Sequence, residues 1–232
     1  MQRNEGTQAD MKYGAIATDY DGTLATDSTV EASTLEALKR YRAAGGSLIL
    51  VTGRRLPELM TVFPQVALFQ AVVAENGAVL YWPERQETQP LSPPLPEAFV
   101  KELQSRQVSP IEQGQVIVAT WEPHGKTVAA TIQDLNLAAN VIFNKRAVMV
   151  LPTGVDKASG LAQALAGLAI SPEQVVAIGD AENDQALLQS CGLGVAVANA
   201  LPSLKTIADR VTAAARGAGV EEVIDWLLSG SL

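Results

Sequence analysis

Asp19 and Asp21 stand two positions apart where a short apolar strand, residues 15–18, gives way to Gly22. In an extended chain this spacing points both side chains the same way. In a parallel α/β sheet the carboxyl end of a strand is also where ligands bind, in the crevice formed by the departing loops. Two interpretations follow: a catalytic carboxylate pair, or an Asp-Gly turn capped by a neighbouring carboxylate.

Two other apolar strands also end in polar residues. Residues 47–51 run into Thr52, Gly53 and Arg54, and residues 175–179 run into Asp180, with Asn183 and Asp184 at the start of the next helix. If the three strands lie in one parallel sheet with right-handed crossovers, their carboxyl ends converge on one crevice. The sequence therefore predicts one site that gathers Asp19, Asp21, Asp180 and Asp184.

Four gathered carboxylates need a counter-charge. Two unit charges about 4 Å apart repel by about 4 kcal/mol at an effective dielectric constant near 20. A hard divalent cation with oxygen ligands balances them, and Mg²⁺ suits a site with few carboxylates, several waters and a substrate phosphate. We therefore predict a magnesium site that handles phosphate groups.

Lys157 and Thr52 are candidate phosphate ligands. Lys157 follows Asp156 at the expected start of a helix, from where it can reach the same crevice as a point charge. The hydroxyl of Thr52 and the backbone N–H of Gly53 are donors suited to phosphoryl oxygens. Considered singly, Lys157 could instead be a solvated surface lysine, and Thr52-Gly53 an ordinary strand-to-helix turn.

The elements that must position these residues alternate as in an α/β sheet. Buried apolar strands are expected at 15–18, 47–51, 71–74, 175–179 and 193–197. Amphipathic helices are expected at 31–44, from 55, from 157 and near the C-terminus. The predicted fold class is α/β, a Rossmann-like doubly wound parallel sheet.

One segment breaks this alternation. Pro83, Pro90, Pro93, Pro94 and Pro96 crowd a stretch that we expect to be a stiff connector and not to extend the sheet. Beyond it the pattern predicts helices at 97–106 and 126–138 and strands at 116–121, 141–143 and 147–151. We expect a core formed by 13–82 and 153–232, a small inserted α+β domain at 83–152, and a flexible tail at 1–12, in which Met11 is an alternative start.

The overall composition disfavours several classes of protein. The chain has 232 residues, of which 47% are hydrophobic, and this is enough for a buried core. Its net charge of −8 opposes binding to the phosphate backbone of nucleic acids. No run of about 18 apolar residues offers a membrane span, and the single cysteine, Cys191, can form no internal disulfide. We expect a cytoplasmic monomer or homodimer that binds neither nucleic acid nor membrane.

Taken in order, these motifs resemble those of the haloacid dehalogenase superfamily. Asp19-Tyr20-Asp21-Gly22-Thr23-Leu24 is similar to its first motif, Thr52-Gly53-Arg54 to its second, Lys157 to its third, and Gly179-Asp180-Ala181-Glu182-Asn183-Asp184 to its fourth. The inserted domain lies between the second and third motifs, as in the subclass with an α/β cap. That subclass includes sugar-phosphate, sucrose-phosphate, mannosylphosphoglycerate and archaeal phosphoglycolate phosphatases, and this cap resembles the phosphoglycolate type in size.

The resemblance implies a role for each motif residue. Asp19 is the expected nucleophile, which forms an aspartyl-phosphate, and Asp21 is the expected acid and base. Mg²⁺ is expected on Asp19, the backbone carbonyl of Asp21, Asp180 and, directly or through water, Asp184. The substrate phosphate is expected to bind Thr52, Gly53 and Lys157, with Asn183 orienting Lys157 or a phosphate oxygen.

Several residues outside these roles keep two interpretations. His124, the only histidine, and Lys126 either contact a polar leaving group or lie in a solvated loop of the cap. Arg54 either contacts phosphate or caps a helix. Glu75-Asn76-Gly77 either approaches the substrate or forms a turn between two strands.

The predicted function is that of a magnesium-dependent phosphatase, a phosphoric monoester hydrolase. Its expected substrate is a small phosphorylated metabolite such as a phosphosugar, phosphoglycolate or phosphoglycerate. A phosphomutase of the phosphomannomutase type and a non-catalytic phosphometabolite sensor are the alternatives. A receiver-like signalling domain is disfavoured because the chain carries an inserted domain and the second aspartate, Asp21.

Overall fold

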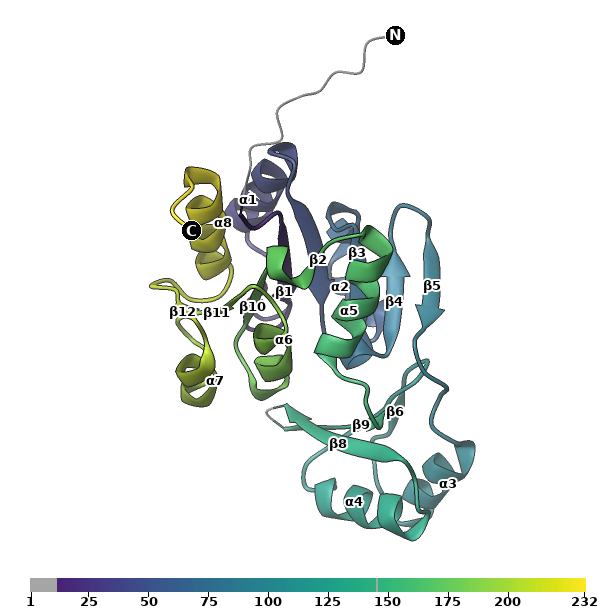
Figure 1. Cartoon of the computed structure of the whole chain (residues 1–232). Coiled ribbons are helices and arrows are strands. Elements are labelled where there is room, and N and C mark those ends of the chain that lie inside the picture. The colour runs from purple at the N-terminus through teal and green to yellow at the C-terminus, as the bar shows by residue number, and fades with distance from the viewer. Residues whose placement is uncertain (1–11, 145) are drawn as a thin grey trace.

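The computed structural model describes residues 12–144 and 146–232, which fold into a large α/β core with a smaller domain below it (Figure 1). Almost all of the tail expected at 1–12, including Met11, lies outside the described residues. Among the described residues, none of the helices has the length and apolar character needed to cross a membrane. The cytoplasmic location and the oligomeric state stay predictions.

The core is built on an eight-stranded sheet in the order β12-β11-β10-β1-β2-β3-β4-β5. Its six parallel strands are β1 (Ala15–Asp19), β2 (Ser47–Val51), β3 (Ala71–Ala74), β10 (Val175–Gly179), β11 (Leu193–Ala196) and β12 (Arg210–Val211). The strands β1, β3, β10 and β11 are buried along their whole length, as their continuous apolar sequences require. The predicted doubly wound parallel sheet is confirmed.

Helices cover the two faces of this sheet. They are α1 (Ala32–Ala43), α2 (Leu56–Val62), α5 (Lys157–Leu168), α6 (Gln185–Gln189), α7 (Pro202–Ile207) and α8 (Arg216–Ser229). The helix α1 packs against α8, whereas α5 packs against α6, β3 and β4. The connection from β1 to β2 crosses the sheet toward β5, whereas the connection from β10 to β11 crosses it toward β12. Because both crossovers are right-handed, α1 and α6 lie on opposite faces of the sheet.

The smaller domain, the cap, has its own sheet and its own apolar core. Its four antiparallel strands, in the order β6-β7-β9-β8, are β6 (Glu112–Gln113), β7 (Val118–Trp121), β9 (Ala147–Pro152) and β8 (Ala139–Asn144). Its helices, α3 (Glu97–Ser105) and α4 (Gly125–Asp134), lie on the side of this sheet away from the core (Figure 1). Phe99, Leu103 and Val128 are fully buried between helices and sheet. The cap elements expected from sequence are present, although α4 ends earlier than the expected 138.

The expectation that the proline-rich stretch adds no strand is wrong. Strand β4 (Val79–Trp82) runs antiparallel to β3, and β5 (Glu87–Pro90) pairs with β4, with Pro90 opposite Val79. The first residues of the segment assigned to the cap therefore extend the core sheet. Proline fits here because β5 is an edge strand, where a missing N–H breaks no ladder on the outer side.

Candidate active site

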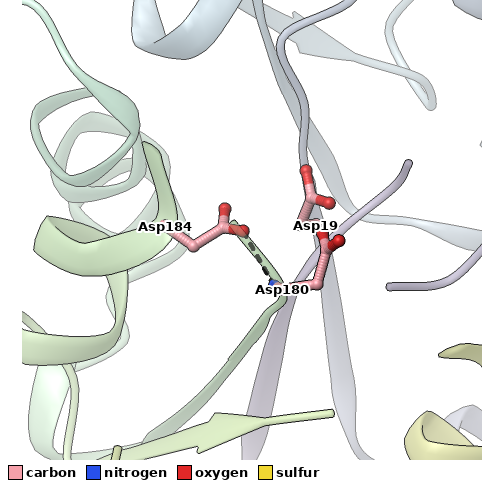
Figure 2. Close-up of side chains that lie close together, drawn as sticks. All are labelled: Asp19, Asp180 and Asp184. Carbon is pink, nitrogen blue, oxygen red and sulfur yellow. Dashed lines mark hydrogen bonds between the residues drawn. The ribbon is translucent and has the colours of Figure 1, made fainter. Parts of the chain in front are cut away.

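Three aspartates meet at the carboxyl ends of two neighbouring strands (Figure 2). Asp19 ends β1, Asp180 follows β10, and Asp184 lies one turn further along the chain. All three are buried, and one carboxylate oxygen from each lies within 4.8 Å of the others. Strands β1 and β10 pair directly, Thr18 opposite Ile178, which brings these ends together. The predicted convergence is confirmed for these three residues.

The loop after β1 is shaped to hold Asp180. Gly22 has a φ of +91°, which glycine adopts without the steric cost that other residues pay. A Cβ at Gly22 would overlap the carboxylate of Asp180. Thr23 donates a hydrogen bond from Oγ1 to Asp180 Oδ1 at 3.2 Å. The sequence Gly22-Thr23 therefore both turns the chain and orients a carboxylate that comes from a distant part of it.

Lys157 lies among these carboxylates and is buried, so it is not a solvated surface lysine. Its Nζ is 2.6 Å from Asp19 Oδ1 and 2.5 Å from Asp184 Oδ1. Asp156 caps α5 by accepting the Ser159 N–H at 2.7 Å, which fixes the first turn that carries Lys157. Burial lowers the pKa of Lys157, but Asp184 and Asp19 raise it more, so the amine stays charged.

Burial makes the ionised form of Asp19 unfavourable. Burial raises its pKa well above the ordinary value; Lys157 opposes the shift, while Asp184 and Asp180 add to it. One lysine thus balances the carboxylates only in part. A divalent cation would complete the balance, and three carboxylates within reach of one point form the all-oxygen donor set that Mg²⁺ prefers. The residues present therefore fit a divalent cation held by Asp19, Asp180 and Asp184.

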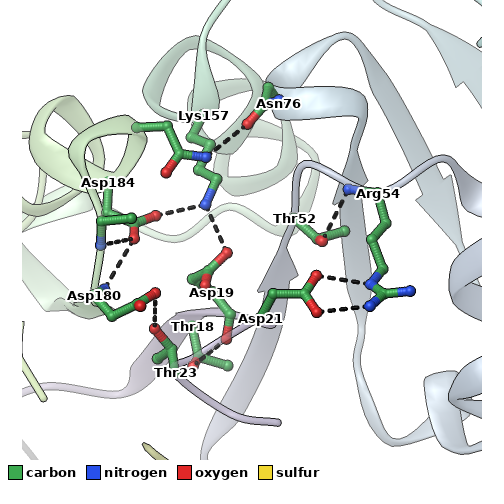
Figure 3. Close-up of polar contacts among 12 residues, drawn as sticks. Thr18, Asp19, Asp21, Thr23, Thr52, Arg54, Asn76, Lys157, Asp180 and Asp184 are labelled. Atoms are coloured by element: carbon green, nitrogen blue, oxygen red, sulfur yellow. Dashed lines mark hydrogen bonds and ion pairs between the residues drawn. The ribbon is translucent and has the colours of Figure 1, made fainter. Parts of the chain in front are cut away.

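The carboxylate of Asp21 is not in this cluster but in an ion pair (Figure 3). Arg54 donates from Nε to Asp21 Oδ2 and from Nη2 to Asp21 Oδ1, each at 2.7 Å. Arg54 also contacts Ser28 and Glu58, at 2.6 and 2.8 Å. The N-cap position of α2 belongs to Arg55, so Arg54 does not cap that helix. A contact of Arg54 with the substrate phosphate stays a prediction.

Thr52 and Asn183 lie beside the cluster. The hydroxyl of Thr52 accepts the N–H of Arg54 at 3.1 Å, so its own proton is available to a ligand. Asn183 donates from Nδ2 to Asn76 Oδ1 at 2.9 Å, whereas its expected contact with Lys157 or a phosphate oxygen stays a prediction. Asn76 is fully buried with a φ of +53°, in a short turn between β3 and β4. The Asn-Gly pair was the sequence signal for that turn, but not for its contact with Asn183.

A cavity of about 400 Å³ lies between core and cap and opens onto Asp19 and Asp21. The core contributes Gly53, Arg54, Arg55 and Glu58; the cap contributes Glu112, Ile117, Ala119, Thr120, Trp121, Asn144, Ala147 and Met149. His124 and Lys126 are not among the described residues that line this cavity. His124 Nε2 instead lies 3.0 Å from the carbonyl oxygen of Ser109. The cap face toward the cavity is thus carried by β7 and by the ends of β8 and β9 that approach the core.

Comparison with known proteins agrees with this geometry. A family of haloacid dehalogenase-like hydrolases matches residues 16–120 and 114–224. A phosphoglycolate phosphatase of Methanothermobacter thermautotrophicus is 35% identical over 220 residues, which cover 90% of this chain and 96% of that protein. A phosphoglycolate phosphatase of Saccharolobus solfataricus is 30% identical, with 93% of this chain and 96% of that protein covered.

Solved structures show the same fold. A haloacid dehalogenase-like hydrolase from Bacteroides thetaiotaomicron superposes with a TM-score of 0.76 at 22% identity, covering 92% of this chain and 98% of that chain. The four motifs, the cap inserted between the second and third of them, and these matches lead to one assignment. The chain belongs to the haloacid dehalogenase superfamily, and within it to the phosphatases with an α/β cap.

Proposed function

We propose that this enzyme is a magnesium-dependent phosphatase that forms an aspartyl-phosphate on Asp19 while it hydrolyses a small phosphorylated metabolite. The observation that carries the proposal is the position of Asp19. Its buried carboxylate lies with Asp180 and Asp184 in the cluster that could hold a metal ion, and it also borders the cavity. A carboxylate in that position can attack a phosphoryl group that enters through the cavity.

Each chain residue at the site has a task in this proposal. Asp19 attacks phosphorus, and Lys157, Thr52 and the N–H of Gly53 hold the phosphoryl oxygens where negative charge accumulates. Asp21, which accepts hydrogen bonds from Arg54 at both oxygens, must first take up a proton, which it then gives to the leaving oxygen. It then takes a proton from the water that hydrolyses the intermediate. The cap excludes bulk water from the closed cavity.

The metal ion fits the same proposal. Asp19, Asp180 and Asp184 would hold Mg²⁺ with their side chains, and Asp21 would add its backbone carbonyl. When bound, the ion supplies positive charge that draws the substrate phosphate toward Asp19.

The substrate class that we propose is a small phosphate ester with an acidic or hydroxylated leaving group. A cavity of about 400 Å³ suits a small ligand. The two arginines on its wall, Arg54 and Arg55, already pair with acidic side chains of the protein, so the proposed acidic leaving group depends on the named relatives and not on these guanidinium groups. The relatives named as phosphoglycolate phosphatases support phosphoglycolate as the first substrate to test.

The experiment is a comparison of substrates with purified protein and Mg²⁺. Release of inorganic phosphate would be measured from phosphoglycolate, 3-phosphoglycerate, several hexose phosphates and mannose 1-phosphate. We expect release from at least one of them, with phosphoglycolate favoured. Conversion of a hexose 1-phosphate to its 6-phosphate without phosphate release would instead identify a phosphomutase, and inertness toward the whole panel would contradict the proposed substrate class.

A further inference from the structure

Glu75 connects the core to the cap through its side chain. It follows β3, is fully buried, and accepts three backbone N–H groups of the cap. Its Oε1 accepts from Gln115 at 2.8 Å, and its Oε2 accepts from Val116 at 3.0 Å and from Ile117 at 3.2 Å. A carboxylate buried this completely needs such donors, because without them its desolvation would cost several times what one hydrogen bond returns.

The cap is shaped to receive this carboxylate. A Cβ at Gly114 would overlap the oxygens of Glu75, so the chain can approach only because residue 114 is a glycine. On the core side, Glu75 has a φ of +53°, which non-glycine residues adopt at a conformational cost. The unfavourable backbone conformation of Glu75 and the missing side chain of Gly114 thus both allow the same three hydrogen bonds to form.

The segment held by Glu75 forms much of the cavity wall. Gln115, Val116 and Ile117 belong to the turn between β6 and β7, and Gly114 N–H donates to Ile117 O at 2.9 Å to close that turn. The same hairpin contributes to the cavity the residues Glu112, Ile117, Ala119, Thr120 and Trp121. Whatever fixes the turn therefore fixes the surface that the leaving group would meet.

The core side of the contact belongs to the catalytic motifs. Glu75 N–H donates to Arg54 O and Asn76 N–H to Thr52 O, each at 2.9 Å. Asn76 Oδ1 also accepts a hydrogen bond from the side chain of Asn183. The turn Glu75–Gly77 is thus bonded to the second and fourth motifs through its backbone and Asn76, and to the cap through the carboxylate of Glu75.

The contact is separate from the covalent connections of the cap. The chain enters the cap after β5 and leaves it after β9. Glu75 supplies an additional, non-covalent attachment on the β6–β7 side. A cap joined to the core by two linkers keeps rotational freedom, and a further attachment reduces it.

We propose that Glu75 is a positioning residue that holds the β6–β7 hairpin over Asp19 and so sets the affinity of the cavity for the leaving group. The proposal rests on the phosphatase function proposed above. Glu75 borders no reacting atom, so its effect is on the fraction of molecules whose cap is correctly placed. Apparent affinity falls in proportion to that fraction, while turnover of the bound complex is preserved.

The test uses two variants that break the contact from opposite sides. Glu75→Gln places an NH₂ group where one oxygen accepts N–H, and Gly114→Ala retains Glu75 but inserts a methyl group against it. Glu97→Gln is the matched control, since Glu97 is an exposed residue of the cap helix α3. Gly14→Ala is the second control, because a Cβ there meets nothing within 4 Å.

Two readouts are compared: amide hydrogen exchange of residues 115–117, and KM and kcat with the best substrate of the panel. Both contact variants are expected to exchange these amides at least about tenfold faster and to raise KM about tenfold, with kcat within about threefold of the parent. Both controls are expected to match the parent protein. Thermal unfolding of each variant verifies the fold, and Gly114→Ala decides the matter if Glu75→Gln does not fold.

Unchanged exchange and unchanged KM in a folded contact variant would overturn the proposal. A fall in kcat at constant KM would also overturn it, because Glu75 would then act on the chemical step. A purely structural role would lower thermal stability and leave KM unchanged. If the parent protein hydrolyses no phosphate ester, the proposed function fails, whereas the exchange of residues 115–117 still reports whether Glu75 holds the hairpin.

Discussion

Arg54 binds both carboxylate oxygens of Asp21, with two donor–acceptor distances of 2.7 Å. The two residues come from the loops after β2 and β1, neighbouring strands of the core sheet. A two-point pair of this kind fixes the plane of the carboxylate as well as its position. The expected acid and base is therefore oriented by a residue of the second motif.

Arg54→Ala should lower kcat by about 10- to 100-fold, because Asp21 loses the partner that orients it. Arg54→Lys should recover only part of this loss, since an ammonium group cannot make the paired contact. Steady-state kinetics would measure both. Arg40→Ala is the control, because Arg40 pairs with Asp225 in an exposed contact. A kcat for Arg54→Ala equal to that of the parent would contradict the orienting role.

Asp19→Asn should reduce turnover at least about a thousandfold, since an amide oxygen is a poor nucleophile toward phosphorus. The folded structure should persist, because the amide can still accept a hydrogen bond from Lys157. Phosphate release and circular dichroism would be measured on the same sample. A folded Asp19→Asn protein with undiminished hydrolysis would refute the nucleophile assignment.

Removal of divalent metal should reduce hydrolysis to background, and Mg²⁺ should restore it. The reason is that Lys157 balances the charge of Asp19, Asp180 and Asp184 only in part, and an approaching phosphate adds more negative charge. The measurement is activity after treatment with chelator and after titration with Mg²⁺. Activity that survives thorough metal removal would refute the metal role.

Stabilisation by Mg²⁺ should be greater at pH 8 than at pH 5. The pKa of Asp19 is raised above its ordinary value of about 3.9, mainly by burial, so the folded metal-free protein retains a proton there that the unfolded chain has lost. The contribution of this group to stability therefore falls as pH rises through the raised pKa. Mg²⁺ competes with that proton for Asp19, so Mg²⁺ binds more tightly as the proton is lost at higher pH.

The measurement for this pH effect is the change in Tm on addition of Mg²⁺ at the two pH values. Asp19→Asn serves as the control, because it has no proton to lose at this position. An equal shift of Tm at pH 5 and pH 8 in the parent protein would count against the titration of Asp19.

Lys157→Met should lower the unfolding free energy of the metal-free protein by about 3–5 kcal/mol, because Asp19 and Asp184 are left buried without their cation. Mg²⁺ should recover much of the loss by supplying positive charge. Urea unfolding with and without Mg²⁺ would measure both effects. Lys39→Met, which removes an exposed pair with Glu36, should change stability by less than about 1 kcal/mol. Equal losses in the two variants would contradict the argument.

The positions of Asp19, Thr52 and Asp180 could be predicted from sequence because each follows a recognisable buried strand. Parallel strands with right-handed crossovers bring their carboxyl ends to one edge, so the local patterns were enough to predict the convergence. The contact between Arg54 and Asp21 could not be predicted in this way. It depends on side-chain geometry between two loops, and hydrophobic periodicity in the sequence predicts helices and strands but not contacts between loops.

The cap residues show a second limit. From sequence, His124 and Lys126 could either contact a polar leaving group or lie in a solvated loop of the cap, and neither lines the cavity. Three residues of β7 line the cavity instead, Ala119, Thr120 and Trp121, while Val118 packs in the apolar core of the cap. The sequence predicted this strand, but its residues identify a cavity face only once the cap sheet is known to face the core.

Strand β1 carries Asp19 and lies between β2 and β10, with Ala15 opposite both Ser47 and Val175. During synthesis the first partner follows within a few tens of residues, but the second is roughly 160 residues away. At ribosomal rates of about 5–20 residues per second, one edge of this apolar strand waits on the order of ten to thirty seconds for its partner. The nascent chain thus exposes an unpaired hydrophobic edge beside Asp19, the proposed nucleophile, and translation completes the cluster of Asp19, Asp180 and Asp184 only after the entire cap has been made.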